Sequence, residues 1–594
     1  MAEALGTLVR VDRMGSVVVL VLVHPPANLW RAEMEAPLTA GLQAALADPG
    51  VSAVILRGEG RGFSAGRALD AALDAAAQEA LTRVCARIEA SPKPVIAAIH
   101  GMALGAGCAL ALAAHWRIAH ESAMFSLPEV SLGLIPGAGA TQRLPRLIGA
   151  EAALRVMLEA RPLSAAEALA LGLVDEVSTG VLGQAALAMA ARASDGRASD
   201  GRASDGRGLA PRPTSAMMPR DLGRLTGLVE AARVAVAASP LPAPLRLIDC
   251  VEAAGLLPFD MGVNLEAAAF GDLSATPEAA GLVHALRAER IALEPPRELA
   301  GQVAPEVRLI GILGAQGFAA DLSLQAVRAG LEVVLVDPDR AALTAALATV
   351  VGALDAEVAA GRLTEPLREA AWARMAAGQG ALPQGLDLVF VAPGVEPAPD
   401  QVVLGASVRG LGLTLAETLG GLAELSIGPG ADLVTLARAA ALGRRLGWRV
   451  VTVGPGGPLE LGLRLALEAA VEALAPVLGE TVVRQALAAA GIGEPPLGPM
   501  PPQGATVVRA ALAALAAESA RMLHDGRARR PADIDAIAVL SGLMPRWLGG
   551  PLHQADRRGA LVLRADLRKL GAAPVFGVSP WIDRLIAQGK GFGL

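Results

Sequence analysis

The sequence predicts a multidomain α/β protein that ends in helical domains. Two stretches of the 594-residue chain alternate short apolar strands with helical patterns, one over residues 1–180 and one from Val307 onward. From Gly462 to the end of the sequence the pattern is helical. At a typical size of roughly 150 residues per domain, the length allows about four domains.

The first stretch is predicted from its apolar runs and its capping residues. Ser164 is followed three residues later by Glu167, which forms a capping box at a helix start, and Gly172 ends that helix. The expected strands are Val17–Val23, Val51–Leu56, Val95–Ile99 and Trp116–Ile118, and the expected helices are Ala36–Leu46, Ala75–Glu89 and Ala109–Ala114. Strands that alternate with helices favour an α/β unit.

A low-complexity repeat follows this stretch. The pentapeptide ASDGR occurs three times in succession over Ala193–Arg207, and it is small, polar and balanced in charge. It has no apolar face to bury, so we interpret it as a flexible surface loop without a function of its own. Helical patterns resume from Asp221 to Leu293, and the sequence EPPRELAGQVAP then marks a boundary at Glu294–Pro305.

The second stretch begins with the apolar strand VRLIGIL at Val307. A turn and a helix follow over Gly314–Gly330, and a second strand covers Leu331–Asp337. Near the end, EPPLGPMPPQ at Glu494–Gln503 breaks any helix, so two C-terminal helical units are expected. The predicted domains are 1–180, 181–300, 301–460, 461–500 and 501–594.

Composition excludes several classes of protein. A net charge of −6 argues against a general nucleic-acid surface. No apolar run approaches the roughly 18 residues of a membrane span, and MAEALGTLVRVDR lacks a signal-peptide pattern, so we expect a cytoplasmic protein. Cys85, Cys108 and Cys250 have no metal-ligand spacing, so neither a metal site nor a disulfide framework is expected.

The segment His100–Arg143 carries the strongest chemical signal. A glycine turn opens a helix, a polar link follows, and Glu129 then precedes a second glycine-rich turn. Glycine lets the backbone approach a ligand closely, and fixed N–H groups can hold a developing negative charge. The order can therefore build a site that stabilises an enolate. Position 109, just after the first turn, is alanine.

Residues 15–180 resemble the crotonase (enoyl-CoA hydratase/isomerase) superfamily. The motifs that carry the resemblance are GFSAGRALD (Gly62–Asp70), KPVIAAIHGMALGAGCALALAAHWRIA (Lys93–Ala119), FSLPEVSLGLIPGAGATQRLPRLIG (Phe125–Gly149) and AAEALALGLVDEV (Ala165–Val177). The resemblance implies the ββα-spiral crotonase fold and a coenzyme A thioester substrate. It also implies an oxyanion hole formed by the backbone N–H groups of Arg67 and Ala106, with Glu129 as the catalytic proton carrier.

The family pattern has two glutamates in its hydratases, and this chain keeps one. The second position matches Glu129, whereas the first matches Ala109, which carries no proton. Single-glutamate members of the superfamily are enoyl-CoA isomerases, so the resemblance favours isomerisation or weak hydration. Asp70 is the best nearby substitute for the missing acid, but we interpret it as a solvated residue at a helix start. The other groups considered are Asp74, His115 and His120, and the two histidines are interpreted as structural.

The two α/β stretches together resemble the multifunctional fatty-acid β-oxidation enzymes, in which a crotonase part is fused to a 3-hydroxyacyl-CoA dehydrogenase part. Leu257–Leu273, Val307–Asp339 and Arg527–Asp556 carry this resemblance. It implies a Rossmann-like doubly wound domain over 301–460 and all-α dehydrogenase-type helical domains after it. Acyl-CoA is the implied ligand, a thiolase is a candidate partner, and the linker helix of the family favours a monomer.

The dinucleotide fingerprint is incomplete. Gly314 stands at its first glycine, but Gln316 and Ala319 replace the second and third. The second glycine lets the backbone meet the pyrophosphate, so Gln316 predicts weak NAD binding or none. Asp337 ends the second strand, where the family has its ribose-binding acid.

The catalytic residues of a dehydrogenase are also incomplete. No histidine lies between His284 and His524, although the family uses a histidine oriented by a glutamate. Glu417 falls on that glutamate, while Ala406 and Ser407 stand near the histidine. An unactivated serine is a poor base, so we expect this half to be degenerate.

Three hypotheses for the function follow. The first is an enoyl-CoA isomerase or weak hydratase acting through Glu129. The second is an active bifunctional hydratase and 3-hydroxyacyl-CoA dehydrogenase with unrecognised substitutes for the missing groups. The third, of another class, is a non-catalytic acyl-CoA-binding or scaffold protein.

Overall fold

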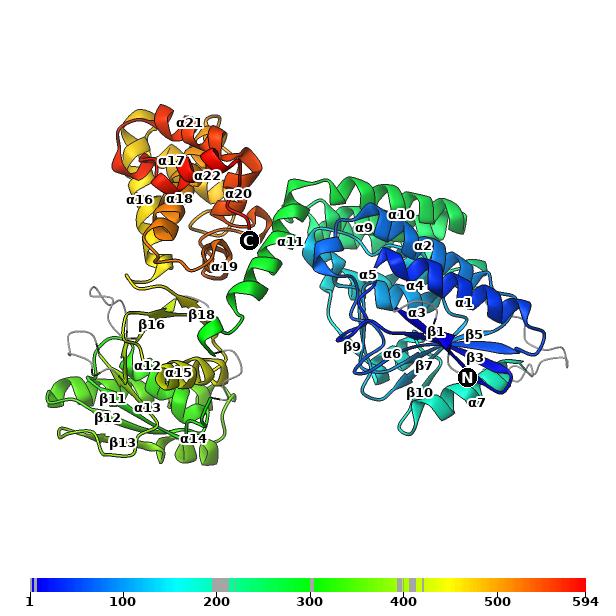
Figure 1. Ribbon diagram of the computed structural model, residues 1–594, viewed down its shortest axis with the longest axis horizontal. Helices are drawn as coiled ribbons and strands as arrows, with labels where there is room; N and C mark the ends of the chain where they lie inside the picture. The colour runs from blue at the N-terminus through cyan, green and yellow to red at the C-terminus, as the bar shows by residue number, and fades with distance from the viewer. Residues whose placement is uncertain are drawn as a thin grey trace. The chain divides into compact units, whose positions relative to one another are not determined.

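The protein folds into two compact units, Met1–Val283 and His284–Leu594 (Figure 1). The computed structural model describes residues 3–4, 8–194, 213–219, 221–299, 304–392, 398, 400–404, 413–418 and 421–594, with the backbone alone for 3–4, Ala71 and 413–418. The finer division predicted from the sequence stays a prediction. Residues 195–207 of the ASDGR repeat lie outside the described residues.

The first unit is built on a seven-stranded sheet in the order β1-β2-β3-β4-β5-β7-β10. The first three strands pair antiparallel, and the strands from β3 onward pair parallel. The strands are β1 (Glu3–Ala4), β2 (Val9–Met14), β3 (Val17–Leu22), β4 (Ala53–Gly58), β5 (Val95–Ile99), β7 (Trp116–His120) and β10 (Glu176–Ser178). The central strands read as nearly continuous apolar runs because both faces of a parallel sheet are covered.

A second, three-stranded sheet and eleven helices complete this unit. The small sheet consists of β6 (Met102–Leu104), β8 (Met124–Ser126) and β9 (Leu163–Ser164). The helices are α1 (Glu35–Ala47), α2 (Ala75–Glu89), α3 (Ala106–Ala113), α4 (Ala140–Ile148), α5 (Ala150–Glu159), α6 (Ala165–Leu171), α7 (Leu182–Ser194), α8 (Leu225–Val236), α9 (Ala243–Leu256), α10 (Phe259–Ser274) and α11 (Pro277–Ala292), the last of which contains the boundary between the units. The predicted capping box is confirmed at Ser164 and Glu167, and Gly172 ends α6 with a φ of +84°.

The side chains of the large sheet alternate between its two faces. Val18, Leu20 and Leu22 of β3 pack into the core that α1, α2 and α3 share. Their neighbours Val17, Val19 and Val21 point to the opposite face, where α7 covers the sheet. The period of two along a strand therefore gives each face its own core.

Helices α8, α9 and α10 belong to the first unit, because their apolar side chains are part of its main core. Glu266 of α10 is buried and reaches the start of α4, where its carboxylate accepts hydrogen bonds from Gly139 N at 2.7 Å and from Thr141 N at 2.9 Å. The Thr141 hydroxyl donates a third bond to it at 2.6 Å. The N–H groups at a helix start attract an anion, so this carboxylate holds α10 to α4.

The second unit contains an eight-stranded sheet in the order β13-β12-β11-β14-β15-β16-β17-β18. All neighbours pair parallel except β16 and β17. The strands are β11 (Leu309–Leu313), β12 (Glu332–Val336), β13 (Met375–Gly378), β14 (Leu388–Val391), β15 (Gln401–Leu404), β16 (Leu413–Thr418), β17 (Leu422–Ile427) and β18 (Arg449–Val453). The helices beside them are α12 (Ala319–Arg328), α13 (Arg340–Ala359), α14 (Glu365–Trp372) and α15 (Leu433–Arg445).

One helix in the described part of the chain, α13, is long and apolar enough to cross a membrane by length and composition. Its residues Leu343, Ala346, Val350 and Leu354 are buried in the core of the eight-stranded sheet. They recur at helical spacing, so packing explains this one face of α13.

The C-terminal helices share a single core (Figure 1). They are α16 (Leu459–Leu478), α17 (Glu480–Ala490), α18 (Gly504–His524), α19 (Pro531–Leu540), α20 (Pro551–Arg558), α21 (Ala560–Leu570) and α22 (Pro580–Gln588). The proline-rich segment Glu494–Gln503 contains no helix, as predicted. Side chains from both sides of that segment nevertheless pack together, for example Leu467 of α16 and Leu515 of α18.

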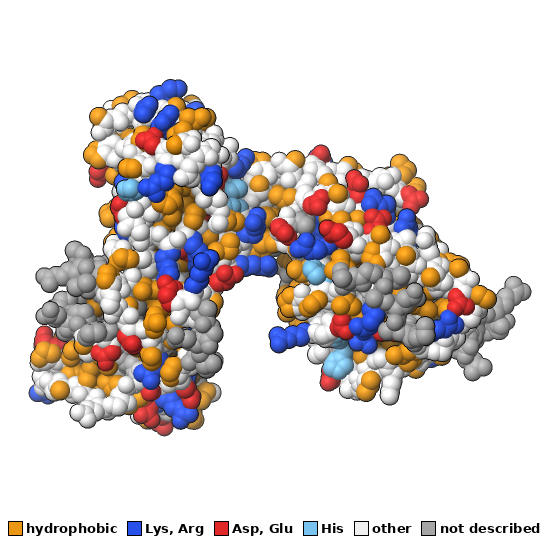
Figure 2. Space-filling view, viewed as in Figure 1, with side chains coloured by type: hydrophobic (Ala, Val, Ile, Leu, Met, Phe, Trp, Pro, Cys, Tyr) orange, Lys and Arg blue, Asp and Glu red, His pale blue; other side chains and the backbone are white. Residues whose placement is uncertain are grey.

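Charged side chains of both signs are interspersed over the surface in the view of Figure 2. The chain carries 52 basic and 58 acidic residues, so its small net charge does not arise from a scarcity of charges. Interspersed charges of this kind favour solubility and give no broad field of one sign that would steer a polyanion to this face.

The Glu266 contact generates the first prediction. Glu266→Ala leaves buried N–H groups of α4 without an acceptor, so we expect the first unit to lose about 1–3 kcal/mol of unfolding free energy in denaturant titrations. The matched control is Asp272→Ala on the same helix, whose exposed side chain pairs with Arg246 at 3.4 Å. This control should cost less than about 0.5 kcal/mol. Equal losses in the two variants would contradict the role of Glu266.

Candidate active site

Two glycine turns and one carboxyl group meet in the first unit. Gly66 has a φ of +92° and Gly105 a φ of +48°, which are backbone conformations that favour glycine. A Cβ placed on Gly105 would lie 2.8 Å from Oε1 of Glu129 and 3.9 Å from the Cα of Gly66. The two glycine turns and Glu129 are therefore brought to one place, and a side chain at position 105 would have to displace the Glu129 carboxylate.

The residues after the two glycines present free backbone donors. Neither Arg67 nor Ala106 uses its N–H in a hydrogen bond with another described residue. Ala106 is the first residue of α3, where the N–H groups have no acceptor within the helix and the helix dipole favours an anion. The turn before it is fixed, because Gly105 N donates to Ser126 O at 2.8 Å. The oxyanion role of these two N–H groups stays a prediction that their availability supports.

Glu129 lies in the short 3-10 helix Pro128–Leu132, which follows β8. Its Oε2 atom is buried and has no hydrogen-bond partner among the described residues. Burial raises the pKa of this carboxyl group to about 7, and the nearby positive charge of Arg67 opposes the shift. A carboxyl group with such a pKa can both take up and return a proton near neutral pH.

The side chain of Arg67 joins α10 to the site. Its guanidinium carbon lies 4.9 Å from the centre of the Phe270 ring, a distance at which a cation and an aromatic face attract. Burial lowers the pKa of Arg67, and the charge of Glu129 opposes that shift. Phe270 was not predicted as a site residue. Sequence reasoning identified α10 only as a linker helix, and no local pattern indicates which of its side chains meets Arg67.

Ala109 occupies the position where a second acid would be expected. It lies one turn after Gly105 on α3, and residues four apart share a helix face. Ala109 is buried and carries no titratable group. That this position corresponds to the second acid of a hydratase stays a prediction.

The four nearby titratable groups do not replace that acid. Asp70 is exposed, as predicted for a solvated residue, and Asp74 caps α2 by accepting a bond from Ala76 N at 2.8 Å. His115 is buried and accepts a bond from Val95 N at 3.0 Å, which is a structural contact. His120 bonds the hydroxyl group of Ser122, which follows it closely in the chain.

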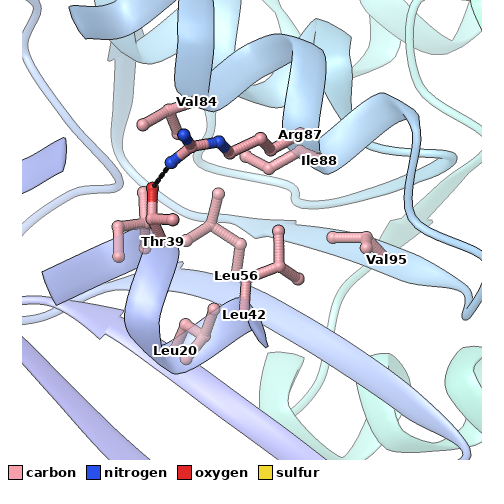
Figure 3. Close-up of a pocket in the computed structure, with 9 residues that line it drawn as sticks. Leu20, Thr39, Leu42, Leu56, Val84, Arg87, Ile88 and Val95 are labelled. Atoms are coloured by element: carbon pink, nitrogen blue, oxygen red, sulfur yellow. Dashed lines mark hydrogen bonds between the residues drawn. The ribbon is translucent and has the colours of Figure 1, made fainter. Parts of the chain in front are cut away.

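A small apolar cavity between α1, α2 and the large sheet is not a binding site (Figure 3). Its volume is about 10 Å³, and its polar contact is the bond from Arg87 Nη1 to Thr39 Oγ1 at 2.7 Å. A volume of this size holds at most about one water molecule, and an apolar wall disfavours even that. We interpret it as a packing gap in the core.

The predicted nucleotide loop is formed in the second unit. Gly314 follows β11 with a φ of +96°, and a Cβ there would clash with the Cβ of Ala392. Gln316 is exposed on the loop, whereas Ala319 is buried at the first position of α12. The structure therefore brings the fingerprint residues to one turn between a strand and a helix.

Asp337 directly follows β12 and binds the backbone of this turn. Its Oδ2 accepts a bond from Ala315 N at 2.6 Å, and its Oδ1 accepts one from Asp339 N at 2.7 Å. The side chain is buried. Each carboxylate oxygen therefore already binds the backbone of this chain, which gives Asp337 a structural role whether or not a ribose is bound.

Glu417 lies in β16, where the structure describes the backbone alone, and Ala406 and Ser407 lie outside the described residues.

A different glutamate, on the paired strand β17, has a distinctive environment and was not predicted from the sequence. Glu424 is fully buried and accepts bonds from Leu459 N at 2.6 Å and from Glu460 N at 2.9 Å, at the start of α16. Burial raises its pKa to about 7. A lone acid in an apolar strand was the signal that could have found it.

Known proteins resemble this chain mainly in its first part. Residues 12–198 match the family model for enoyl-CoA hydratase/isomerase. The peroxisomal bifunctional enzyme of Danio rerio is 33% identical over 350 residues, which cover 57% of this chain and 46% of that protein. A probable enoyl-CoA hydratase of Bacillus subtilis (strain 168) is 44% identical over 165 residues, which cover 27% of this chain and 64% of that protein.

A third relative is the fatty acid oxidation complex subunit alpha of Shewanella amazonensis, which is 35% identical over 268 residues that cover 43% of this chain and 37% of that protein. The chain spans about half the length of the curated relatives that it matches. These likenesses identify residues 12–198 as similar to the enoyl-CoA hydratase/isomerase (crotonase) family, and they relate the chain over part of its length to a peroxisomal bifunctional enzyme and to a fatty acid oxidation complex subunit alpha.

Proposed function

We propose that this chain is an acyl-CoA enzyme of fatty-acid β-oxidation that moves the double bond of 3-enoyl-CoA to give 2-enoyl-CoA. The observation that carries the proposal is the unpartnered, buried Oε2 of Glu129 beside two glycine turns, with Ala109 in place of a second acid. One carboxyl group can shuttle a proton between two carbons. Efficient hydration needs one group to activate water and another to protonate carbon, so hydration would be at most a weak side activity.

The reaction needs only groups of this chain. The N–H groups of Arg67 and Ala106 would hold the thioester oxygen, and the ionised Glu129 would remove a proton from C2 of the substrate. The electron pair of the broken C–H bond then forms the dienolate, whose negative charge rests on the held oxygen. Glu129 returns the proton to C4, so the double bond moves from C3–C4 to C2–C3 and the substrate neither gains nor loses atoms or electrons.

We further propose that the dehydrogenase-like half does not oxidise 3-hydroxyacyl-CoA. The exposed side chain of Gln316 stands where backbone would meet a pyrophosphate. The sequence between His284 and His524 contains no histidine that could serve as the base. The residues present therefore fit NAD poorly.

Glu129→Gln tests the proposed proton carrier. The amide cannot take up the proton, so turnover of 3-enoyl-CoA should fall by about 10²–10⁴-fold, while acyl-CoA binding persists through the unchanged backbone donors. Glu121→Gln, an exposed glutamate eight residues earlier, is the matched control and should keep wild-type turnover. Unchanged turnover in Glu129→Gln would contradict the proposal, and a wild-type protein that binds acyl-CoA without any turnover would support the scaffold hypothesis instead.

The raised pKa of Glu129 sets the pH profile. The base form exists above a pKa of about 7, so kcat/KM for isomerisation should be level at higher pH. It should fall about tenfold for each pH unit below that pKa. Stopped assays across pH 5.5 to 9 in a buffer of constant ionic strength measure the profile. A level profile down to pH 5.5 would show that Glu129 has an ordinary pKa or is not the base.

A titration with NAD tests the second unit. Because Gln316 blocks the approach of backbone to phosphate, calorimetry should show no saturable binding tighter than about 1 mM. Micromolar affinity, or reduction of NAD by 3-hydroxyacyl-CoA, would overturn this interpretation and favour an active bifunctional enzyme.

A further inference from the structure

A second cavity lies on the opposite face of the large sheet from α1, α2 and α3, beneath the first turn of α7. Its volume is about 520 Å³, and β2, β3, β4, β5, β7 and the start of α7 line it. Small-molecule sites usually measure roughly 300–1,000 Å³. Val19, Ile55 and Ala98 form part of its floor and belong to the separate core under α7. The cavity is therefore distinct from the site around Glu129.

The alternation of the strands explains its chemistry. Ile55 of β4, Ala98 of β5 and Ile118 of β7 point toward α7 as apolar neighbours. Two residues further along each strand, the same direction is taken by polar side chains, which are Arg57, His100 and His120. Apolar floor and polar rim thus meet at the carboxyl ends of three adjacent parallel strands, an edge where α/β sheets often bind ligands.

The start of α7 keeps the cavity open. Gly180 and Gly183 line it, and a Cβ on either glycine would meet no atom within 4 Å. Farther along the helix, Met189 and Ala190 pack tightly on the sheet. The helix thus covers the sheet closely at its far end and leaves space at its first two turns.

Two polar groups on the rim are available to a ligand. Arg57 has no carboxylate partner within the described part of the chain, and its Nε donates a long bond of 3.4 Å to Gly58 O. His120 Nδ1 lies 2.8 Å from Ser122 Oγ and 3.2 Å from Ser122 N, so Nε2 is the ring nitrogen that is left to contact a ligand. His100 is engaged, because its Nε2 donates to Gly60 O at 3.0 Å.

The acids near the cavity are already paired. Asp12 also lines it, but its carboxylate accepts from Arg10 Nε at 3.2 Å. Arg10 in turn donates to Glu59 at 2.6 Å through Nη1. The unpaired charge that remains on the rim is the guanidinium of Arg57, which suits a carboxylate in a bidentate contact.

We propose that this cavity binds a small amphipathic carboxylate, a monocarboxylic acid with an apolar body. The apolar body would lie on Val19, Ile55 and Ala98, and the carboxylate would meet Arg57 and Nε2 of His120. This is a ligand site separate from the acyl-CoA site, and it stands whether or not Glu129 acts as proposed.

Octanoate is the probe for the test, titrated into the full chain by calorimetry. Saturable binding is expected in the wild type, and 1-octanol, which has the apolar body without the charge, should bind at least about tenfold more weakly, a difference of about 1.4 kcal/mol. Arg57→Met removes the cation, and Gly183→Leu fills the cavity from a helix position with open space. Each variant should weaken octanoate binding at least tenfold.

Gly227→Leu is the matched control, because Gly227 is an exposed glycine of α8 that also has open space around it and does not line the cavity. It should leave octanoate binding unchanged, and all three variants should keep wild-type melting temperatures and enoyl-CoA turnover. Octanoate affinity unchanged in both Arg57→Met and Gly183→Leu, equal binding of 1-octanol, or no saturable binding in the wild type would each overturn the proposal.

Discussion

The contact between Gly105 and Glu129 is the constraint on which the site depends. The turn needs glycine because it adopts a φ of +48°, and a Cβ at position 105 would also displace the Glu129 carboxylate, since it would lie 2.8 Å from Oε1. The same turn starts α3 and leaves the N–H of Ala106 free beside the carboxyl group. Close packing removes water from Glu129, and desolvation raises its pKa to about 7. This backbone turn therefore presents an unused N–H group in the same region as a carboxyl group whose pKa suits proton transfer.

Helix α10, which follows the ASDGR repeat, contacts Arg67 and the start of α4. Phe270 of α10 lies against the guanidinium of Arg67, and Glu266 of the same helix holds the start of α4 through three hydrogen bonds. Because Arg67 and Glu129 lie on separate short segments outside the main helices and strands, their positions depend on such contacts. Helix α10 is therefore part of the first unit and of the environment of its site, and is more than a connection to the second unit.

Local sequence patterns predicted the helices whose ends depend on contacts between residues close in sequence. The helix Ala75–Glu89 was predicted with its observed ends, which the structure shows capped by Asp74, and the capping box at Ser164 was confirmed. The start of α3 was predicted at Ala109 but lies at Ala106, because Gly105 leaves the helical conformation directly before it. Within the site, the meeting of Arg67 with Phe270 joins residues 203 positions apart, and no local pattern encodes it. Glu424 was missed for the same reason, since its partners belong to α16.

The most direct test of the account is the product ratio of the wild-type protein given 3-enoyl-CoA and 2-enoyl-CoA in separate reactions. With one carboxyl group and Ala109 at the second position, we expect 2-enoyl-CoA to form from the first substrate. We expect hydration of the second substrate to be slower by about 10²-fold or more, because a positioned second acid or base is worth at least that factor. Hydration as fast as isomerisation, measured by chromatography of the two products, would contradict it.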